Sequence, residues 1–322
     1  MATVFPGSEV TVAEVRPRFE GSNICTWIGF KHVMYLVEEA VLAHFREQGL
    51  VPRELFEEHG LCLEIVDSSV RILHALHMDD VARVEVRPRT RDEDTEMRFD
   101  VALFVDREGR EVKALTGKVR VLFRADQGTA AGVPGPGELS PFVVPKISRS
   151  REMPSHSYQF QGRGEDVGAD DPIRRVVPAD ANAYLWKWHI PYFYCHFTER
   201  LQHSGYLRLM EEVVDRFLAA RGISIRTLLE THRWIPVVPS ARVEILDEAL
   251  MEETIYVVYT VEEIFKEFTY TSRMDCYVPR GDGLLHTATG RITHGYAEIE
   301  SRRDWKLVTF DDTVVRALSG SA

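Results

Sequence analysis

The sequence predicts an α+β protein built from two tandem domains, each a long helix wrapped by an antiparallel sheet. Two observations predict this fold class: an internal repeat, and the same succession of a strand, an amphipathic helix and several strands in both copies. The chain has 322 residues, of which 44% are hydrophobic and 28% are charged. This length accommodates two domains, and the composition is typical of proteins with a buried core.

The repeat is visible when the chain is aligned with itself at an offset of 173 residues without a gap. Identical pairs in this register include Leu36 with Leu209, Glu38 with Glu211, Glu39 with Glu212, Gly49 with Gly222, His59 with His232 and Gly117 with Gly290. Two long copies indicate a duplicated domain and not a solenoid of short repeats. We therefore expect Glu38 to superpose on Glu211 and Gly117 on Gly290.

Each copy contains one long amphipathic segment followed by segments of alternating polarity. Apolar residues at helical spacing predict helices over residues 35–48 and 206–220, which Gly49 and Gly222 follow as suitable left-handed caps. Alternation with β-branched and aromatic residues predicts strands at 68–76, 82–89, 96–106 and 113–123, and at 241–246, 253–263, 266–278 and 286–299. Turn-forming residues at 106–111 and 279–284 predict that the last two strands of each copy form a hairpin.

These elements place a first repeat at residues 1–125, a linker at 126–180 and a second repeat at 181–322. Residues 126–142 are rich in Gly and Pro, which predicts an extended linker. The Gly-rich run at 161–168 lacks the strand, loop and helix context of a nucleotide site, so we interpret it as a loop. Because a lone sheet leaves its edges exposed, we expect the two sheets to join into one larger sheet.

Charge, cysteine content and motifs exclude several function classes. A net charge of −11 argues against a nucleic-acid partner, since phosphate binding needs concentrated positive charge. The four cysteines are scattered without metal-ligand spacing, which predicts reduced thiols. The N-terminus lacks the pattern of a signal peptide, and no apolar run is long enough to span a membrane. We expect a cytoplasmic protein, and the absence of phosphate, dinucleotide and metal motifs implies no bound cofactor.

The stretch from residue 200 to 217 places a histidine where the chain enters a helix. His203 would act there as a base, while the backbone N–H groups of Ser204, Gly205 and Tyr206 would stabilise an oxyanion. Glu211 and Glu212 follow about two turns later, and the sequence does not decide which of them faces the site. A structural alternative also fits: Ser204 would be the N-cap of the helix, and both glutamates would be solvated.

Residues 192–299 resemble the hotdog fold of acyl-thioester hydrolases, in particular the 4-hydroxybenzoyl-CoA thioesterase-like group. His203, Tyr206 and Glu211 fall at the intervals of that group's histidine, tyrosine and acidic residue. The resemblance extends more weakly to residues 10–125, and it implies two tandem hotdog domains joined into a double hotdog. His196 stands where many members carry an aspartate, so their carboxylate-assisted mechanism is not carried over.

The first copy offers a less regular site. His32 precedes Glu38 by six residues, whereas His203 precedes Glu211 by eight, so the two histidines do not align. The first turn is then shorter, or His32 belongs to a site of its own, or the first copy is a structural partner.

The approach to the second site is rich in aromatic residues, including Tyr194, which suits an acyl pocket or an interdomain core equally. His196 would border such a pocket. Cys195 and His196 are adjacent on an expected strand and would point to opposite faces, which argues against a nucleophile–base pair.

The sequence therefore predicts an enzyme that hydrolyses acyl thioesters of coenzyme A or of an acyl carrier protein. Its catalytic candidates are His203, Glu211, Glu212 and His32, and its substrate-binding candidates are Ser204, Gly205, Tyr206, His196 and Tyr194. A hotdog dehydratase or hydratase and a non-catalytic acyl-binding or assembly protein remain as alternatives. We expect neither a nucleic-acid nor a membrane partner, and a homo-oligomer is compatible with the sequence.

Overall fold

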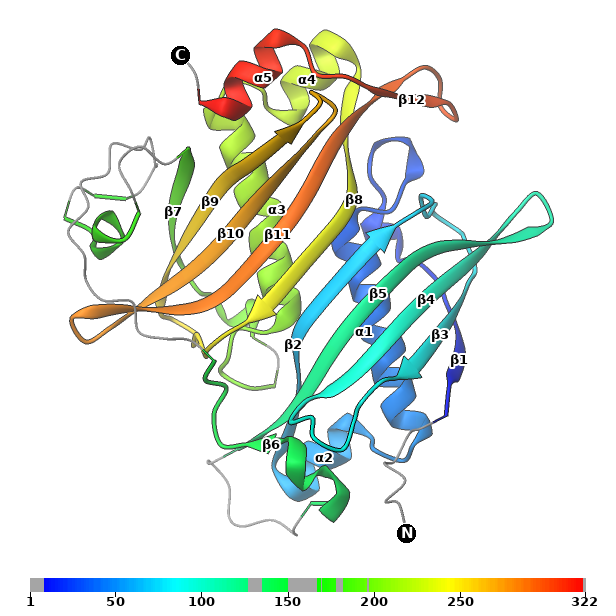
Figure 1. The fold of residues 1–322 in the computed structure, drawn as a ribbon, viewed down its shortest axis with the longest axis vertical. Coiled ribbons are helices and arrows are strands. Elements are labelled where there is room, and N and C mark those ends of the chain that lie inside the picture. The colour runs from blue at the N-terminus through cyan, green and yellow to red at the C-terminus, as the bar shows by residue number, and fades with distance from the viewer. Residues whose placement is uncertain are drawn as a thin grey trace. The chain divides into compact units, whose positions relative to one another are not determined.

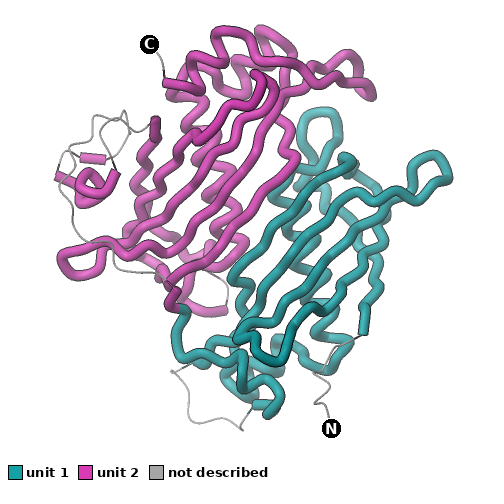
Figure 2. The backbone as a smooth tube through the Cα atoms, in the orientation of Figure 1, with its two compact units in different colours: residues 1–147 teal, residues 148–322 magenta. Residues whose placement is uncertain are grey.

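The computed structural model describes residues 9–126, 135–149, 167–168, 170–177, 182–195 and 197–320. The chain divides into two compact units, Met1–Ile147 and Ser148–Ala322 (Figure 2). The division falls between Ile147 and Ser148, inside the stretch expected as a linker. Each unit is described by itself below.

The first unit consists of one long helix against an antiparallel sheet (Figure 1). Its strand order is β1-β3-β4-β5-β2, and the two-residue strand β6 pairs in parallel with β5. In chain order the elements are β1 (Thr11–Val15), α1 (Phe30–Glu47), α2 (Pro52–His59), β2 (Leu61–Ile72), β3 (Ala82–Pro88), β4 (Met97–Arg107), β5 (Arg110–Ala125) and β6 (Val143–Val144).

The second unit repeats this plan and adds a C-terminal strand and helix. Its strand order is β8-β11-β10-β9-β7, and β12 pairs with β11. In chain order the elements are β7 (Ala183–His189), α3 (His203–Ala220), α4 (Ile225–His232), β8 (Trp234–Ile245), β9 (Thr254–Phe265), β10 (Thr269–Arg280), β11 (Gly283–Ile299), β12 (Trp305–Val308) and α5 (Asp312–Ser319).

The predicted duplication is confirmed at the level of single residues. The elements α3, α4 and β8 begin and end 173 residues after α1, α2 and β2. Strand register is kept as well, since Val70 pairs with Gly117 and Val243 pairs with Gly290. Glu38 and Glu211 both occupy the ninth position of their helices. The two units therefore share one fold, and equivalent positions can be compared directly.

The matched glycines have a steric reason. A Cβ atom on Gly117 would lie 3.2 Å from the carbonyl oxygen of Ser69, and one on Gly290 would lie 3.1 Å from that of Arg242. The same space at Gly290 is occupied by the side chain of Met210 from α3. Glycine at these positions lets the neighbouring strand, and in the second unit the helix, approach closely.

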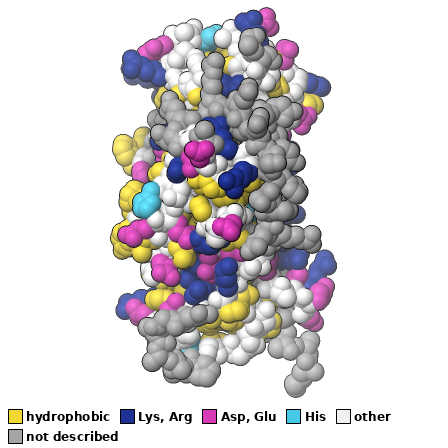
Figure 3. Space-filling view, turned by 90° about the vertical axis from the view of Figure 1, so that its left-hand side faces the viewer, with side chains coloured by type: hydrophobic (Ala, Val, Ile, Leu, Met, Phe, Trp, Pro, Cys, Tyr) yellow, Lys and Arg dark blue, Asp and Glu magenta, His cyan; other side chains and the backbone are white. Residues whose placement is uncertain are grey.

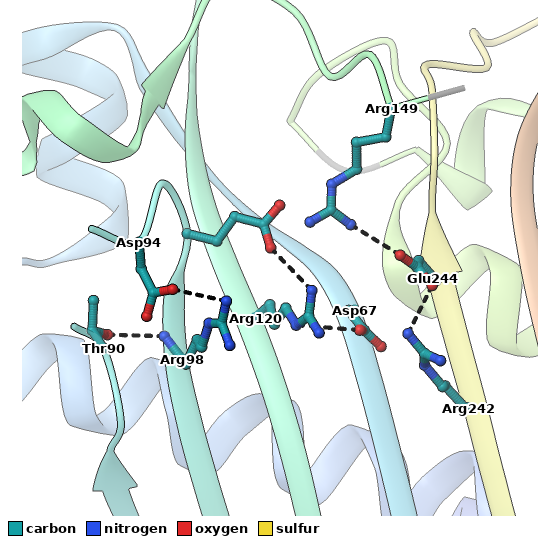
Figure 4. Close-up of polar contacts among 9 residues, drawn as sticks. Asp67, Thr90, Asp94, Arg98, Arg120, Arg149, Arg242 and Glu244 are labelled. Carbon is teal, nitrogen blue, oxygen red and sulfur yellow. Dashed lines mark hydrogen bonds and ion pairs between the residues drawn. The ribbon is translucent and has the colours of Figure 1, made fainter. Parts of the chain in front are cut away.

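The sheet face turned away from the helix carries charged side chains. Arg98 and Arg120 alternate with buried apolar residues on β4 and β5, so they point to this opposite face. Arg98 contacts Asp94 at 2.7 Å, and Arg120 contacts Asp67 at 3.5 Å (Figure 4). In the second unit, Glu244 contacts Arg149 and Arg242, which ties the segment before β7 to β8.

Parts of the stretch expected as an extended linker are folded. Residues Gly137–Phe142 form a 3-10 helix whose Leu139 and Phe142 side chains are buried. In the second unit, Pro172–Arg175 form a short 3-10 helix whose Ile173 packs with Val167 and Val177 against Tyr277 and other apolar residues of the sheet. The expectation of an extended segment was wrong for Gly137–Phe142, because the buried side chains of Leu139 and Phe142 outweigh the Gly and Pro content. Residues 161–166 of the predicted loop lie outside the described residues.

On the face of the molecule drawn in Figure 3, basic and acidic side chains are interspersed. All four cysteines are free thiols. Among the described residues, no helix is long and apolar enough to cross a membrane.

Candidate functional site

The candidate site is built around the first turn of α3. His203 is the first residue of the helix, and Gln202 occupies the N-cap position with extended backbone angles and without a side-chain capping bond. The expectation that Ser204 would be the N-cap is therefore wrong. The N–H group of Tyr206 donates to the carbonyl of Gln202 at 3.1 Å. An anion at this end of the helix would meet first-turn N–H groups and the positive end of the helix dipole.

Two loops fix the position of this helix end. The N–H of Leu201 donates to the carbonyl of Ala249 at 2.8 Å, and the N–H of Met251 donates to that of Glu199 at 2.7 Å. Gly205 lies directly against the preceding loop, because a Cβ atom there would come within 2.9 Å of the Tyr194 carbonyl oxygen. The glycine therefore permits the aromatic loop to pack onto the first turn.

Polar side chains are buried around this turn. Each is at most 8% exposed: Arg200, Gln202, His203, Ser204, Asp247 and Thr287. Asp247 follows β8, and its N–H donates to the carbonyl of Thr287 on β11. Three separate segments of the second unit therefore contribute to one polar region.

Tyr206 connects these segments. Its hydroxyl is buried close to Thr287, Cys276 and Asp247, and burial raises the pKa of the phenol well above its usual value. The phenol therefore stays protonated and can donate a hydrogen bond. Sequence reasoning missed Arg200, Asp247 and Thr287, because only the fold brings their segments together.

The equivalent positions of the first unit are largely apolar. Arg200, Gln202, His203, Tyr206 and Thr287 correspond to Trp27, Gly29, Phe30, Val33 and Ala114. Ser204 and Asp247 correspond to the polar residues Lys31 and His74. Since the backbone elements match residue for residue, this difference comes from side chains alone. Among the described residues, the second unit buries several polar side chains at the start of its long helix, whereas the first unit buries His32 there.

The two glutamates lie in different surroundings. Glu212 forms an ion pair with Arg216 at 2.8 Å, and the guanidinium of Arg216 lies 4.4 Å from the centroid of the Trp186 ring. Glu211 is partly buried. Eight residues of helix advance about 12 Å, so Glu211 does not contact His203 within the same helix.

His32 does not correspond to His203, because α1 begins at Phe30 in the same register as α3. A shorter first turn is therefore not the explanation for the misalignment. The His32 ring is buried against Gly21, where a Cβ atom would lie 2.7 Å from the ring carbon Cγ. Its ring centroid lies 5.2 Å from that of Tyr35 in an edge-to-face arrangement.

The aromatic loop beside the site is ordered by ring contacts. The ring centroids of Tyr194 and Trp188 lie 4.6 Å apart, and the Arg208 guanidinium lies 5.3 Å from the Tyr194 centroid. Burial raises the pKa of the Cys195 thiol to about 11, so it is neutral at physiological pH and a poor nucleophile. His196 lies outside the described residues.

One family model matches within the second unit. Residues 176–318 match the model of the thioesterase-like superfamily, so this part of the chain is similar to that superfamily. No curated protein sequence matches the chain.

Solved structures share the fold of the whole chain. A protein described as an oleoyl thioesterase from Lactobacillus plantarum superposes with a TM-score of 0.57 at 10% identity, covering 89% of this chain and 96% of its own. The 12:0-ACP thioesterase from Umbellularia californica has a TM-score of 0.56 at 13% identity, covering 92% and 97%. An acyl-ACP thioesterase from Bacteroides thetaiotaomicron has a TM-score of 0.54 at 8% identity, covering 88% and 97%. The predicted fold, two tandem hotdog units in one chain, is confirmed.

Proposed function

We propose that the chain is a thioester hydrolase that cleaves acyl groups from coenzyme A or an acyl carrier protein, with its active site at the first turn of α3. The contrast between the units carries this proposal. Both copies bury a histidine in the first turn of the long helix, His32 and His203. Among the described residues, the one in the second copy lies in a group of buried polar side chains: Arg200, Gln202, Ser204, Asp247 and Thr287. The superfamily to which the second unit is similar and the thioesterases of similar fold support the same reaction class.

In this reaction a water molecule attacks the thioester carbonyl carbon, the carbon–sulfur bond breaks, and a carboxylic acid and a thiol form. His203 would accept a proton from the water and return it to the leaving sulfur. N–H groups of the first helical turn would stabilise the developing oxyanion. Ser204, Gly205, Tyr206 and Tyr194 would line the substrate's path, and Asp247 is the buried carboxylate that we add to the site as a positioning residue.

The decisive experiment measures hydrolysis of a panel of acyl-CoA and acyl-carrier thioesters by thiol release and by product mass. His203→Ala should lower kcat/KM by about 10²- to 10⁴-fold, the usual contribution of a positioned acid–base group. Glu211→Gln tests whether this carboxylate acts on substrate further along the helix. Glu212→Gln is its matched control, because Glu212 is held by Arg216. His32→Ala tests whether the first unit holds a second working active site.

Wild-type rates for His203→Ala in folded protein would contradict the assignment. A product that has gained or lost water while keeping its thioester bond would indicate a hydratase or dehydratase. Binding of acyl thioesters without turnover by the wild type would indicate an acyl-binding protein.

A further inference from the structure

A second group of buried polar side chains lies in the core of the second unit, near the other end of α3. We call Tyr259, Tyr270, Ser272, His294 and Tyr296 the core polar cluster; each is at most 3% exposed. Tyr270 and His294 are cross-strand partners whose rings stack with centroids 5.1 Å apart. Tyr259 packs against Phe217 of α3. The cluster therefore faces the helix and not solvent.

These side chains have more hydrogen-bonding capacity than the fold uses. Tyr259 interacts with Ser272 and Tyr270, and Tyr270 interacts with Tyr296. Within the described part of the chain, these contacts do not reach good hydrogen-bond geometry, and His294 Nδ1 has no hydrogen-bond partner. Buried polar groups without partners cost free energy, and native proteins keep few of them.

The first unit shows that the fold does not require polar residues here. The five positions correspond, in the same strand register, to Val86, Met97, Phe99, Val121 and Phe123. All five are apolar and at most 3% exposed. One fold therefore fills the same space once with an apolar core and once with five hydrogen-bonding side chains, which points to a ligand of the second unit.

The protonation states define the chemistry of such a ligand. Burial raises the pKa of all three phenols, so each keeps its proton. Burial lowers the pKa of His294 to about 3, so the imidazole is neutral at physiological pH. The cluster therefore offers neutral donors and acceptors, which suit a hydroxyl or carbonyl group and not an ion.

The position of the cluster relates it to the proposed active site. Phe217 lies fourteen residues after His203, so the cluster lies about 21 Å along the helix axis from the first turn. An extended chain advances about 1.2 Å per bond, which places the cluster roughly 14 to 18 bonds from the thioester carbonyl. Met210 and Met274 lie between the two regions, and such flexible side chains are suited to making room for an acyl chain.

We propose that the core polar cluster binds an oxygen-bearing group near the far end of a long acyl chain. This inference rests on the proposed function and specifies its substrate class: long-chain acyl thioesters with a distal hydroxyl or carbonyl group. A plain alkyl end would add no hydrogen-bond partner for these five side chains. A distal hydroxyl can both donate to and accept from them.

The test compares hexadecanoic acid with its ω-hydroxy derivative by calorimetric binding to the full chain, below the micelle concentration. The wild type should bind the hydroxy acid about tenfold more tightly, the effect of about one buried hydrogen bond. Tyr259→Phe and Tyr270→Phe remove only a hydroxyl and should reduce the preference to about twofold or less. Tyr277→Phe is the matched control, because Tyr277 is a buried tyrosine of β10 that packs against the 167–177 segment instead. It should keep the wild-type preference.

The inference is overturned if neither acid binds, if the wild type does not prefer the hydroxy acid, or if the cluster variants keep the preference. Variants that gain thermal stability without a change in preference would show that the cluster holds only water, which also overturns it. Binding of free acids does not depend on turnover. A retained preference without hydrolysis of any thioester would refute the proposed function alone, and hydrolysis without preference would refute this inference alone.

Discussion

At the scale of single residues, the two units place glycine on opposite sides of the same contact between a loop and the long helix. In the first unit, Gly21 makes room for the His32 ring on the helix. In the second unit the equivalent positions are Tyr194 and Gly205, where the glycine lies on the helix and makes room for the loop. Both solutions fill the same gap between loop and helix. This difference in the position of the glycine explains why the first unit carries a histidine near its helix start that is not the counterpart of His203.

Gly205→Ala should destabilise the protein and lower its activity. The added Cβ would lie 2.9 Å from the Tyr194 carbonyl oxygen and 2.6 Å from Leu201 Cδ1, so the loop must shift. Overpacking of this kind costs about 1–3 kcal/mol. Urea unfolding measures the change. Gly137→Ala is the control, because nothing lies within 4 Å of its added Cβ. Equal stability of the two variants would contradict the close packing described for this loop.

Cys195 should be dispensable for catalysis. Since burial raises its thiol pKa to about 11, the reactive thiolate is scarce below that pH. Cys195→Ser should keep thioester hydrolysis within about threefold, because no thiolate chemistry is lost. In the folded wild type, iodoacetamide at neutral pH should label the partly exposed Cys25 before Cys195. Loss of turnover in a folded Cys195→Ser protein would instead implicate the thiol.

The sequence identified His203 because a histidine, a glycine and a tyrosine at helical entry form a local pattern. It did not identify Asp247 or Thr287, which lie far along the chain and reach the site only through the pairing of β8 and β11. Nor did it identify the core polar cluster, because tyrosine and histidine on alternating strands look like ordinary strand residues. The cluster is visible in the sequence only when the two copies are aligned, because its polar residues in the second copy then stand opposite apolar residues of the first.

At the scale of elements, the repeat and most strands were predictable, whereas helix starts and folded linker parts were not. The helices begin at Phe30 and His203, a few residues before the predicted starts, because neither N-cap residue makes a side-chain capping bond that would mark the boundary. Gly49 and Gly222 follow the helices with φ angles of 73° and 75°, as the predicted left-handed caps require.

The segment at 167–177 should separate from the sheet of the second unit in acid. Asp171 holds it there, accepting hydrogen bonds from Lys187 Nζ at 2.8 Å and Tyr256 Oη at 2.7 Å. Burial alone would raise the Asp171 pKa, but these bonds and that from Gly168 N–H outweigh burial and lower it. A lowered folded pKa contributes stability above the unfolded value of about 3.9, and this contribution is lost as pH falls through the folded pKa.

Asp171→Asn should therefore reduce stability at pH 7 by about 1–2 kcal/mol and have a smaller effect near pH 3. Denaturant unfolding at both pH values measures this difference. An effect of the substitution that is equal at both pH values would show that the charge of Asp171 does not hold the segment.

At the scale of the whole molecule, duplication allowed the two units to diverge in their cores while keeping their backbones. The first unit has apolar side chains at most of the positions where the second carries two sets of buried polar groups. Polar groups inside a core lower stability unless they are paired, and they are retained where a ligand uses them. This difference in buried polar side chains agrees with a first unit that stabilises the protein and a second unit that carries the proposed active site.

The difference in buried polar side chains between the units predicts that the matched helices α1 and α3 are unequally protected from hydrogen exchange. A buried polar group without a good hydrogen bond, such as His294 Nδ1, costs about 1–3 kcal/mol, whereas the equivalent positions of the first unit pack apolar side chains without this cost. Amides of residues 210–218 in α3 should therefore exchange at least about tenfold faster than those of residues 37–45 in α1, measured by mass spectrometry without ligand. Tyr270→Phe and His294→Val together bring the cluster closer to the first unit and should slow exchange in α3. Two results would contradict this prediction: amides of α3 that exchange as slowly as those of α1, or a double variant that exchanges as fast as the wild type. Either result would show that the core polar cluster does not lower the stability of the second unit, because its polar groups are hydrogen-bonded within the fold.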